Sequence, residues 1–421
     1  MTRRDLILAV VAFFVAGGVV GCKDKAPGPA TQPGGGGKQA AGPAEAKLAP
    51  VSLPLSRPTA DTKALDAAHL AKAQDLINGG LKFLLARREA DGGWSLGGGL
   101  MKPAITALVV KALLRHPDLE RSSPVVKKAF EVILRYRQKD GAIFDAKLGQ
   151  SAYTTAIAIM AMAEAKDPAF NEAIRSAAAY LKGLQIVPGQ ESADGAKVAS
   201  DDPRGGGVGY GKNGEPNLSV LGFVVESWRD AGLQPDDPAM KRAVEFLSRV
   251  QNRSESNPTM PWAGEGGNDG GFVYDLSTSK AGEGPGGSGL RSYGSMTYTG
   301  FKSMLYAGVD KSDPRVQAAY MWIRRYWRLD SNPNMPKLRS QEGLFYYYHV
   351  FAKALRAWGA DEIPDLKGAK HNWRHELTDA LAGHVAPDGS WTNQSAKRWE
   401  EGNPVLSTCF GVLALEEALK K

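Results

Sequence analysis

A short turn recurs along this chain, and it constrains the fold more than any other feature of the sequence. The turn is Asp-Gly followed closely by an aromatic residue, and it occurs at 91–94, 140–144, 269–272 and 388–391. Weaker versions occur at 206–210 and 342–345. A unit that recurs in this way is typical of repeat proteins, in which each unit buries its apolar face only against its neighbours.

Each turn lies between two helical patterns. The patterns before the turns have apolar residues at helical spacing with Lys, Arg and Glu between them, as half-exposed helices have. They cover 65–86, 125–137, 170–184, 240–250, 316–327 and 373–384. The patterns after the turns are richer in Ala, Thr, Ser, Gly and aromatic residues, and cover 105–114, 153–164, 218–228, 296–308, 346–358 and 405–419. We therefore predict an all-α fold, an α6/α6 toroid of six helix pairs with alternating outer and inner helices.

These segments resemble the repeats of the squalene cyclase and protein prenyltransferase superfamily. In the first repeat the resemblance rests on Phe83-Leu84-Leu85 and Asp91-Gly92-Gly93-Trp94, with Arg88 where the family usually has Gln. The outer segments of the next three repeats end in Gln138, Gln185 and Gln251. The resemblance covers roughly residues 65 to 419. It implies a terpenoid cyclase-like α/α toroid, in which the aromatic residue after Asp-Gly ties neighbouring helices together.

The N-terminus has the pattern of an export signal. Arg3 and Arg4 precede an apolar stretch over 6–20, which is shorter than the ~20 residues that a membrane span needs. The stretch ends in Val-Val-Gly-Cys, which resembles a bacterial lipobox, with the cysteine, Cys22, as the lipidated residue. We predict a signal peptide over 1–21 and an exported protein anchored in a membrane of the bacterial envelope, facing the periplasm or the cell surface. An ordinary secretory signal and a retained short anchor remain alternatives.

Residues 22–62 are dominated by Pro, Gly, Ala and Lys, and such a segment cannot bury enough apolar surface to order itself. We expect a disordered tether over 22–62 and the toroid over 63–421. Cys409 is the only other cysteine, and with Cys22 lipidated it has no disulfide partner. The toroid must therefore be held together by its core.

The longest predicted links run from outer to inner helices, at 186–217, 251–295, 328–345 and 385–404. Because the helices alternate, these links lie on one face of the ring, and we expect a ligand-binding mouth there. A basic residue lies near the start of each inner helix, which suits an anionic ligand or is simply chance spacing: Lys102, Lys147, Lys212, Arg291, Arg339 and Arg398. Of these, Arg291 and Arg398 are our candidate ligand-binding residues.

Aromatic residues on the inner helices and loops suit an isoprenoid or other lipid, a carbocation or a glycan, although many of them have to pack helix against helix. The candidates are Tyr153, Tyr210, Phe223, Trp262, Phe272, Tyr298, Tyr346 and Tyr347.

Catalytic motifs of the related families are absent. Neither Asp201-Asp202 nor Asp236-Asp237 completes the Asp-x-Asp-Asp acid motif, and no Asp-x-Cys pair with a distant His is present for zinc. We therefore expect no metal and no cofactor. Carboxylates near the mouth remain candidate acids and bases, namely Glu226, Asp269, Asp275 and Glu342, with His349 as a possible base. Glu226 is notable because it interrupts an apolar stretch.

Two classes of function remain open. One is a binding or scaffolding protein of the envelope, whose mouth captures an apolar or anionic ligand or a protein partner. The other is an enzyme acting on an isoprenoid or a glycan, and the missing motifs favour the first. The net charge of +7 is spread along the helices, so we expect no nucleic-acid partner.

Overall fold

The computed structural model describes residues 54–191, 195–265 and 267–421. The predicted signal peptide, Cys22 and most of the predicted tether lie outside these residues. Among the described residues, no helix combines the length and the apolar character that crossing a membrane requires.

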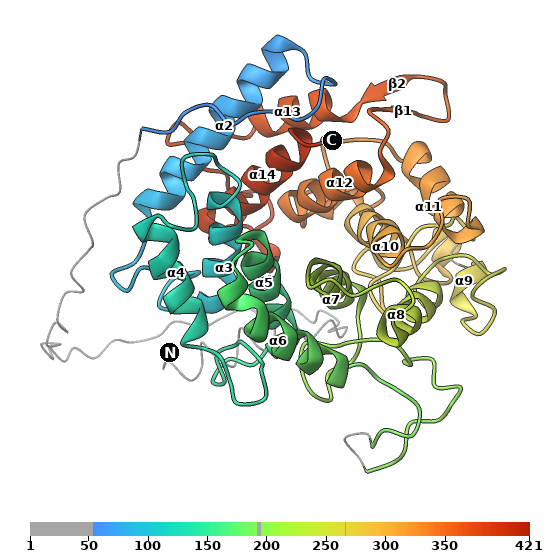
Figure 1. The fold of residues 1–421 in the computed structure, drawn as a ribbon. Helices are drawn as coiled ribbons and strands as arrows, with labels where there is room; N and C mark the ends of the chain where they lie inside the picture. The colour runs from blue at the N-terminus through green and yellow to red at the C-terminus, as the bar shows by residue number, and fades with distance from the viewer. Residues whose placement is uncertain (1–53, 192–194, 266) are drawn as a thin grey trace, which may run out of the picture. The chain divides into compact units, whose positions relative to one another are not determined.

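Helices of ten or more residues alternate between the outside and the inside of one ring (Figure 1). The outer helices are α2 (Ala67–Ala86), α4 (Pro124–Leu134), α6 (Asn171–Gly183), α8 (Pro238–Arg249), α11 (Pro314–Arg325) and α13 (Trp373–Ala382). The inner helices are α3 (Lys102–Leu113), α5 (Ser151–Glu164), α7 (Leu218–Asp230), α10 (Gly294–Tyr306), α12 (Leu344–Trp358) and α14 (Pro404–Ala418). Each inner helix packs against the next, and α14 packs against α3. The predicted α/α toroid is confirmed; its division into six sequence repeats remains our interpretation.

Burial separates the two kinds of helix as the sequence patterns predict. Every residue of α14 after Pro404 is buried, because this helix has neighbours on all sides. In contrast, α8 buries one stripe that includes Met240, Ala243 and Leu247, and its Lys and Glu residues lie between. The two sequence patterns therefore reflect how many faces of each helix are packed against other helices.

The four Asp-Gly turns share one set of hydrogen bonds. In each turn the Asp side chain accepts a hydrogen bond from the backbone N–H two residues later, at 3.0–3.1 Å. The glycines have φ between +81° and +93°, which glycine adopts without strain. The next backbone N–H donates to a Thr of the following inner helix at 2.9–3.1 Å, in the pairs Trp94–Thr106, Ile143–Thr155, Phe272–Thr297 and Trp391–Thr408. In the second turn the paired residue is therefore Ile143 and not the aromatic Phe144.

In each of two repeats, a glutamine connects the turn of that repeat to the next outer helix. Gln185 donates to the carbonyls of Gly206 and Ala239, and Gln251 donates to those of Gly270 and Arg315. Gly206 thus occupies the place of the Asp-Gly turn in its repeat. The weak version at 342–345 differs, because Gly343, with φ of +70°, directly precedes the first residue of α12.

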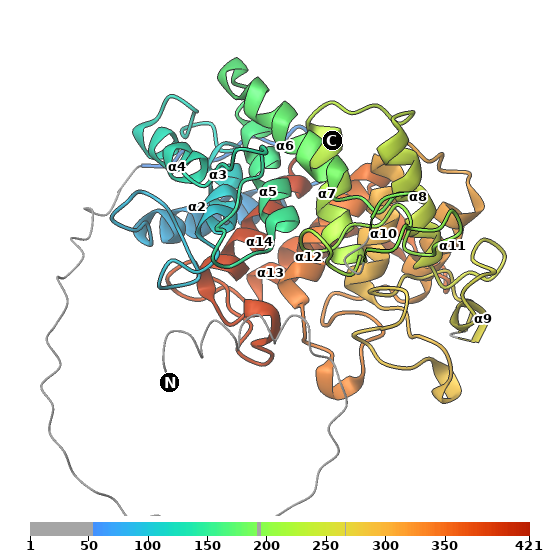
Figure 2. The same cartoon turned by 90° about the horizontal axis from the view of Figure 1, so that it is seen from below.

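The long links gather at one end of the ring, which we call the mouth. They connect α6 to α7, α8 to α10, α11 to α12 and α13 to α14, and the second of them contains the four-residue helix α9 (Trp262–Glu265). Figure 2 shows the last three links along one edge of the ring. At the opposite end the links are shorter, and the one between α12 and α13 forms an antiparallel hairpin of β1 (Glu362–Pro364) and β2 (Lys370–Asn372).

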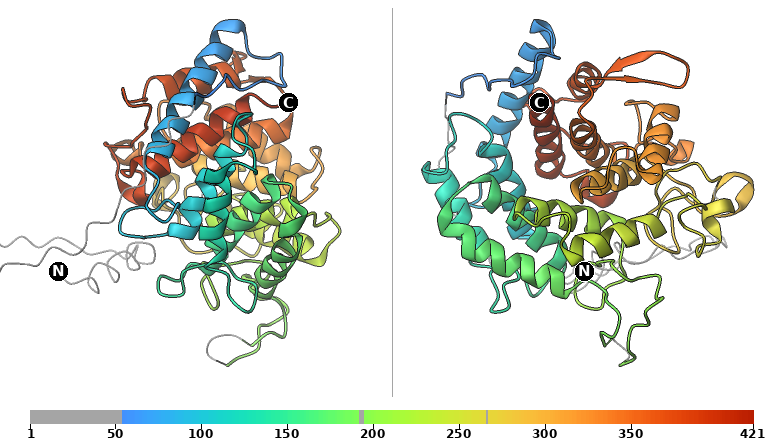
Figure 3. Two further views of the ribbon diagram at one scale, coloured as in Figure 1. Left: turned by 60° about the vertical axis from the view of Figure 1, so that its left-hand side comes forward. Right: turned by 45° about the vertical axis from the view of Figure 1, so that its right-hand side comes forward.

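The described part of the predicted tether, 54–62, packs against the end of the ring opposite the mouth. The carbonyl of Ser56 accepts hydrogen bonds from Asn78 and His116. The N–H of Asp61 donates to the carbonyl of Leu419 at 2.7 Å, so this segment lies beside the C-terminus (Figure 3). We expected disorder up to residue 62; in the structure, these backbone groups have hydrogen-bond partners on α2, in the link after α3 and at Leu419, the residue after α14.

Candidate functional site

Aromatic side chains from different inner helices meet in the half of the ring nearest the mouth. The Tyr153 and Phe223 rings are 4.9 Å apart between centroids, Phe223 and Tyr346 6.1 Å, and Tyr346 and Phe410 5.8 Å. All four residues belong to the first half of their helices, and Tyr153 and Tyr346 are only partly buried. Tyr210 and Tyr274, from two mouth links, are also partly buried, and their hydroxyls are 3.4 Å apart. The structure therefore brings three predicted ligand-binding residues, Tyr153, Phe223 and Tyr346, into one apolar cluster.

Three cationic side chains lie together at the mouth. Glu342 accepts hydrogen bonds from Arg339 at 2.7 Å and from Arg398 at 3.3 Å. Lys280 Nζ lies over the Tyr274 ring, 4.0 Å from its centroid. Burial lowers the pKa of Lys280, the charge of Asp275 opposes this, and the charges of Arg398 and Arg339 lower the pKa further. We call Lys280, Arg339 and Arg398 the mouth cations.

The backbone at the mouth is strained next to these cations. Trp399 and Glu400 are consecutive non-glycine residues with φ of +57° and +64°. Such left-handed conformations cost free energy and persist where the surroundings enforce them, often at functional sites. Trp399 lies against Gly343 at the start of α12, since an added Cβ there would be 3.0 Å from its ring. The surroundings thus hold Trp399, the residue after Arg398, in this conformation.

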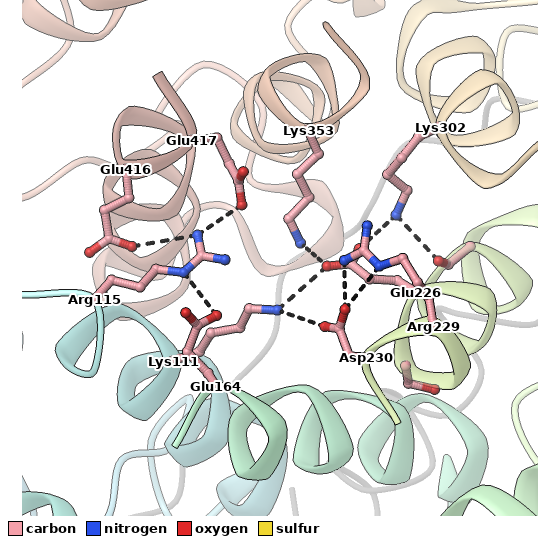
Figure 4. Close-up of polar contacts among 12 residues, drawn as sticks. Lys111, Arg115, Glu164, Glu226, Arg229, Asp230, Lys302, Lys353, Glu416 and Glu417 are labelled. Atoms are coloured by element: carbon pink, nitrogen blue, oxygen red, sulfur yellow. Dashed lines mark hydrogen bonds and ion pairs between the residues drawn. The ribbon is translucent and has the colours of Figure 1, made fainter. Parts of the chain in front are cut away.

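The other half of the ring is filled by a buried network of charges (Figure 4). Its centre is Glu226 of α7, whose carboxylate lies 2.5 Å from Lys353 Nζ, 2.8 Å from Lys302 Nζ and 3.5 Å from Lys111 Nζ. These four side chains are at most 3% exposed. Asp230, one turn later, is 3.5 Å from Lys111 and 2.6 Å from Arg229. Four cations thus surround two carboxylates.

The network shifts the pKa values of its members. Burial raises the pKa of Glu226, but the charges of Lys302, Lys353 and Lys111 outweigh burial and hold the pKa well below its usual range. Burial lowers the pKa of Lys353 to about 7, although the charge of Glu226 opposes this. Glu226 is therefore an ionised structural anion at neutral pH and a poor proton donor.

A second buried group adjoins the first. Arg115, in the link after α3, lies 2.8 Å from Glu417 and 3.1 Å from Glu164. Burial raises the pKa of Glu417, but Arg115 and Arg356 outweigh burial and hold it well below its usual range. For Glu416 burial prevails over the charge of Arg115 and raises the pKa well above its usual value. One neutral and one charged carboxyl group thus lie side by side on α14.

The predicted catalytic residues do not share one site. Asp269 is partly buried in its Asp-Gly turn, where it accepts hydrogen bonds from Ser292 at 2.6 Å and Trp322 at 3.0 Å. Asp275 accepts backbone N–H groups of Ser277 and Thr278, which is a turn-forming role.

Glu342 binds two arginines of the mouth, as described above. His349 is buried in α12 with its ring 5.2 Å from Phe410. Burial lowers the pKa of His349 well below its usual value, and the charge of Lys353 lowers it further, so the imidazole is neutral.

Five of the predicted ligand-binding residues have structural surroundings instead. Phe272 is fully buried against Gly300 of α10. Tyr298 and Tyr347 pack against each other and against Phe351 within the helical core. Trp262 donates to the carbonyl of Leu276, and Arg291 donates to that of Glu283, so each holds a loop. Arg398 remains at the mouth. Of the other basic residues named from the sequence, Lys102 pairs with Glu89 at 2.6 Å, and Lys147 and Lys212 are exposed.

The three buried lysines were missed from the sequence, although each leaves a signal there. Lys111 and Lys302 are each the only charged residue of an inner-helix segment, just as Glu226 is, and Lys353 shares its segment with His349 and Arg356. A lone charge at such a position has to find an opposite charge from another helix. The pattern predicts pairing, but only the ring shows that all three lysines reach one carboxylate.

Solved structures of similar fold were found, whereas no protein-family model and no curated protein matches the sequence. Type II terpene cyclase MstE from Scytonema in its apo form is 16% identical, with a TM-score of 0.51, and the match covers 83% of this chain and 99% of that chain. A variant of that cyclase in complex with geranylgeranyl dihydroxybenzoate is 16% identical, with a TM-score of 0.50 and coverage of 84% and 99%. Protein geranylgeranyltransferase-I from Candida albicans, complexed with GGPP, is 12% identical, with a TM-score of 0.38 and coverage of 70% and 89%.

At these identities the likeness concerns the fold. The match to the cyclase spans nearly its whole length, and the helices that it covers form the closed ring described above. The chain is therefore an α/α toroid with the fold of the type II terpene cyclases.

Proposed function

We propose that the toroid binds an anionic amphiphile at its mouth and does not cyclise it. The observation that carries the proposal is the chain of contacts from a mouth cation to the aromatic cluster: Lys280 lies over the Tyr274 ring, the Tyr274 hydroxyl is 3.4 Å from that of Tyr210, and the Tyr210 carbonyl accepts the N–H of Ala152, next to Tyr153. The apolar part of the ligand would lie against Tyr153, Phe223 and Tyr346, and its acidic group would face Lys280, Arg339 and Arg398. Such a site combines apolar walls with a few placed polar groups, as ligand pockets do.

An isoprenoid is our preferred apolar part. Aromatic rings suit an unsaturated chain, and the Scytonema cyclase of the same fold binds geranylgeranyl dihydroxybenzoate. The alternatives are a lipid of another kind, a glycan or a protein partner. The two probes described below test whether the site binds an apolar chain, as the last two alternatives would not require.

The charges in the ring disfavour cyclisation through carbocations. Protonation of an alkene needs a strong acid in contact with the substrate. Glu226, a carboxylate buried inside the ring, is ionised and held by three lysines. A carbocation beside these lysines would be repelled, because opposite charges and not like charges stabilise developing charge. The same arrangement suits an anionic ligand.

The test is a comparison of two probes on the purified full chain at physiological salt. Geranylgeranyl diphosphate carries the acidic group, and geranylgeraniol has the same chain without the charge. We expect saturable binding of both by calorimetry, with tighter binding of the diphosphate. Arg398→Ala should weaken the diphosphate at least tenfold and leave the alcohol unchanged, whereas Tyr346→Ala should weaken both.

The matched control is Lys147→Ala, an exposed basic residue in another outer-to-inner link. It should leave both affinities unchanged. Equal affinity of the two probes would overturn the proposal by showing that the mouth cations do not bind the acidic group. No binding of either would overturn it in favour of a glycan or a protein partner. A probe recovered with altered covalent structure would instead support the enzyme alternative.

Export and lipid anchoring form a second part of the proposal. They rest on the sequence around Arg3, Arg4 and Cys22. In the native cells we expect mass spectrometry to find a mature N-terminus at a lipid-modified Cys22, and Cys22→Ser to release the protein from membranes. An intact 1–21 segment with an unmodified cysteine would contradict this.

A further inference from the structure

We propose that Asp66, His69 and His375 form a binding site for a divalent transition metal, of which Zn²⁺ is the best fit. The site lies on the outside of the ring, away from the mouth, and does not depend on the proposed ligand. No local sequence pattern predicts this site, because the two histidines are 306 positions apart in the chain.

The site lies where the first and the last outer helices meet. Asp66 caps the N-terminus of α2, His69 belongs to the first turn of α2, and His375 belongs to the first turn of α13. The backbone N–H of Asp66 is 3.3 Å from His375 Nε2. Lys72 of α2 and Asp379 of α13 form an ion pair of 2.6 Å across the same contact. The two helices are thus held in register around the histidines.

The possible ligand atoms are spaced for one small ion. The three residues offer atoms that all lie within 4.8 Å of one another. Asp66 Oδ2 is 2.9 Å from His69 Nδ1 and 3.9 Å from His375 Nε2. In a tetrahedral zinc site with bonds of about 2.0–2.2 Å, ligand atoms lie roughly 3.3–3.5 Å apart. The observed distances fall on both sides of this value, so shifts of about half an ångström would suffice for these two pairs.

The histidine between the helices already has an outer partner. His69 Nε2 lies 3.4 Å from Asp379 Oδ2, and Asp379 is in turn bound by Lys72. Nδ1 lies 2.9 Å from both Asp66 oxygens, so a metal would replace the proton that Nδ1 shares with Asp66, while Nε2 donates to the carboxylate of Asp379. Metal-binding histidines are commonly oriented in this way, and the carboxylate raises their basicity.

Binding requires one side-chain movement. The His69 and His375 rings are stacked, with centroids 3.9 Å apart and planes 1° from parallel. Lone pairs in parallel planes do not point at one position, so one ring has to turn. The His375 side chain is 26% exposed, which leaves it room for this rotation. Two imidazoles and one carboxylate favour Zn²⁺ over Mg²⁺ or Ca²⁺, which prefer oxygen ligands alone.

A metal here would hold the ring closed. α2 and α13 belong to opposite ends of the folded chain, and their contact is not covalent. An ion bound to both would therefore stabilise the folded state, because the separated histidines of the unfolded chain bind it less well.

The test is zinc titration of the full chain, without an affinity tag and after removal of metal by EDTA. We expect one equivalent to bind, a rise of the melting temperature by a few degrees, and visible absorption typical of tetrahedral coordination when Co²⁺ replaces Zn²⁺. His69→Ala and His375→Ala should each weaken binding at least tenfold and abolish the temperature rise. His384→Ala, an exposed histidine just after the same α13, is the control and should change neither.

Each variant is first compared with the wild type without metal, so that a folding defect is recognised. Binding that survives both substitutions, or no binding at millimolar zinc, would overturn the proposal. An octahedral Co²⁺ spectrum would overturn the three-residue ligand set.

Discussion

The ammonium group of Lys353 lies 2.5 Å from the carboxylate of Glu226 in a part of the ring where both side chains are only 2% exposed. Lys111 and Lys302 reach the same carboxylate from two other inner helices. Glu226 therefore links α3, α10 and α12 to α7. A buried charge whose partner is removed costs several times more free energy than a surface pair contributes.

Replacing Glu226 by Gln should therefore lower the free energy of unfolding by about 3–5 kcal/mol, because three buried lysines lose their shared anion. Chemical denaturation at pH 7 measures this. Glu131→Gln is the control, since Glu131 pairs only with Lys128 on the exposed face of α4 and is 63% exposed. A loss below about 1 kcal/mol for Glu226→Gln would show that the lysines are stabilised by other means.

Two adjacent glycines of α2 should respond in opposite directions to alanine. A Cβ at Gly80 would lie 2.5 Å from Val412 and 3.0 Å from the Trp391 ring, so Gly80→Ala should destabilise by about 1–3 kcal/mol through overpacking. A Cβ at Gly79 would meet only Gly389 at an ordinary 3.5 Å. Gly79→Ala should then stabilise by about 0.5–1 kcal/mol, because alanine favours the helix. Thermal unfolding of both variants checks this, and a change of the same sign in both would contradict the packing of α2 on α14.

Glu401 should make stability depend on pH. Its buried carboxylate accepts hydrogen bonds from the N–H of Tyr346 and from Asn393, both at 2.8 Å, and burial nevertheless raises its pKa to about 7. Between the unfolded pKa near 4.5 and the folded value, the folded state binds more protons, so this contribution to stability is lost as the pH rises.

The free energy of unfolding of Glu401→Gln relative to wild type should therefore increase by about 3 kcal/mol from pH 4 to pH 8. Urea unfolding of both proteins across this range measures the difference. A difference that is constant with pH would show that the hydrogen bonds keep Glu401 ionised.

Relief of the strain at the mouth should stabilise the chain. Glu400 has φ of +64°, and glycine adopts this conformation without the steric cost of a side chain. Glu400→Gly should thus raise the free energy of unfolding by about 0.5–1 kcal/mol. Glu215→Gly, at an exposed mouth residue whose φ is not left-handed, should give no gain. If Glu400→Gly lost stability instead, contacts of the side chain would outweigh the strain.

The ring of helices could be predicted from the sequence alone. The predicted ends of its helices lie within three residues of the observed ends, because the apolar pattern of a helix depends on how many of its faces are packed. The Asp-Gly turns were found because a left-handed glycine and a side-chain acceptor are local requirements. The Thr that completes each turn was not predicted, because its separation from the turn changes with the length of the link. Thr106 follows Trp94 by 12 positions, whereas Thr297 follows Phe272 by 25.

Which distant residues meet depends on the tertiary structure and could not be predicted from the sequence. Glu226 was singled out as an isolated charge, but its three lysines come from other helices, and their convergence depends on how far each helix is rotated in the ring. Tyr298 and Tyr347 looked the same in sequence as Tyr346, yet they face the core because neighbouring positions of a helix point in different directions. The pair His69 and His375 exists only because the ring closes, and no local pattern encodes a contact between the two ends of a chain.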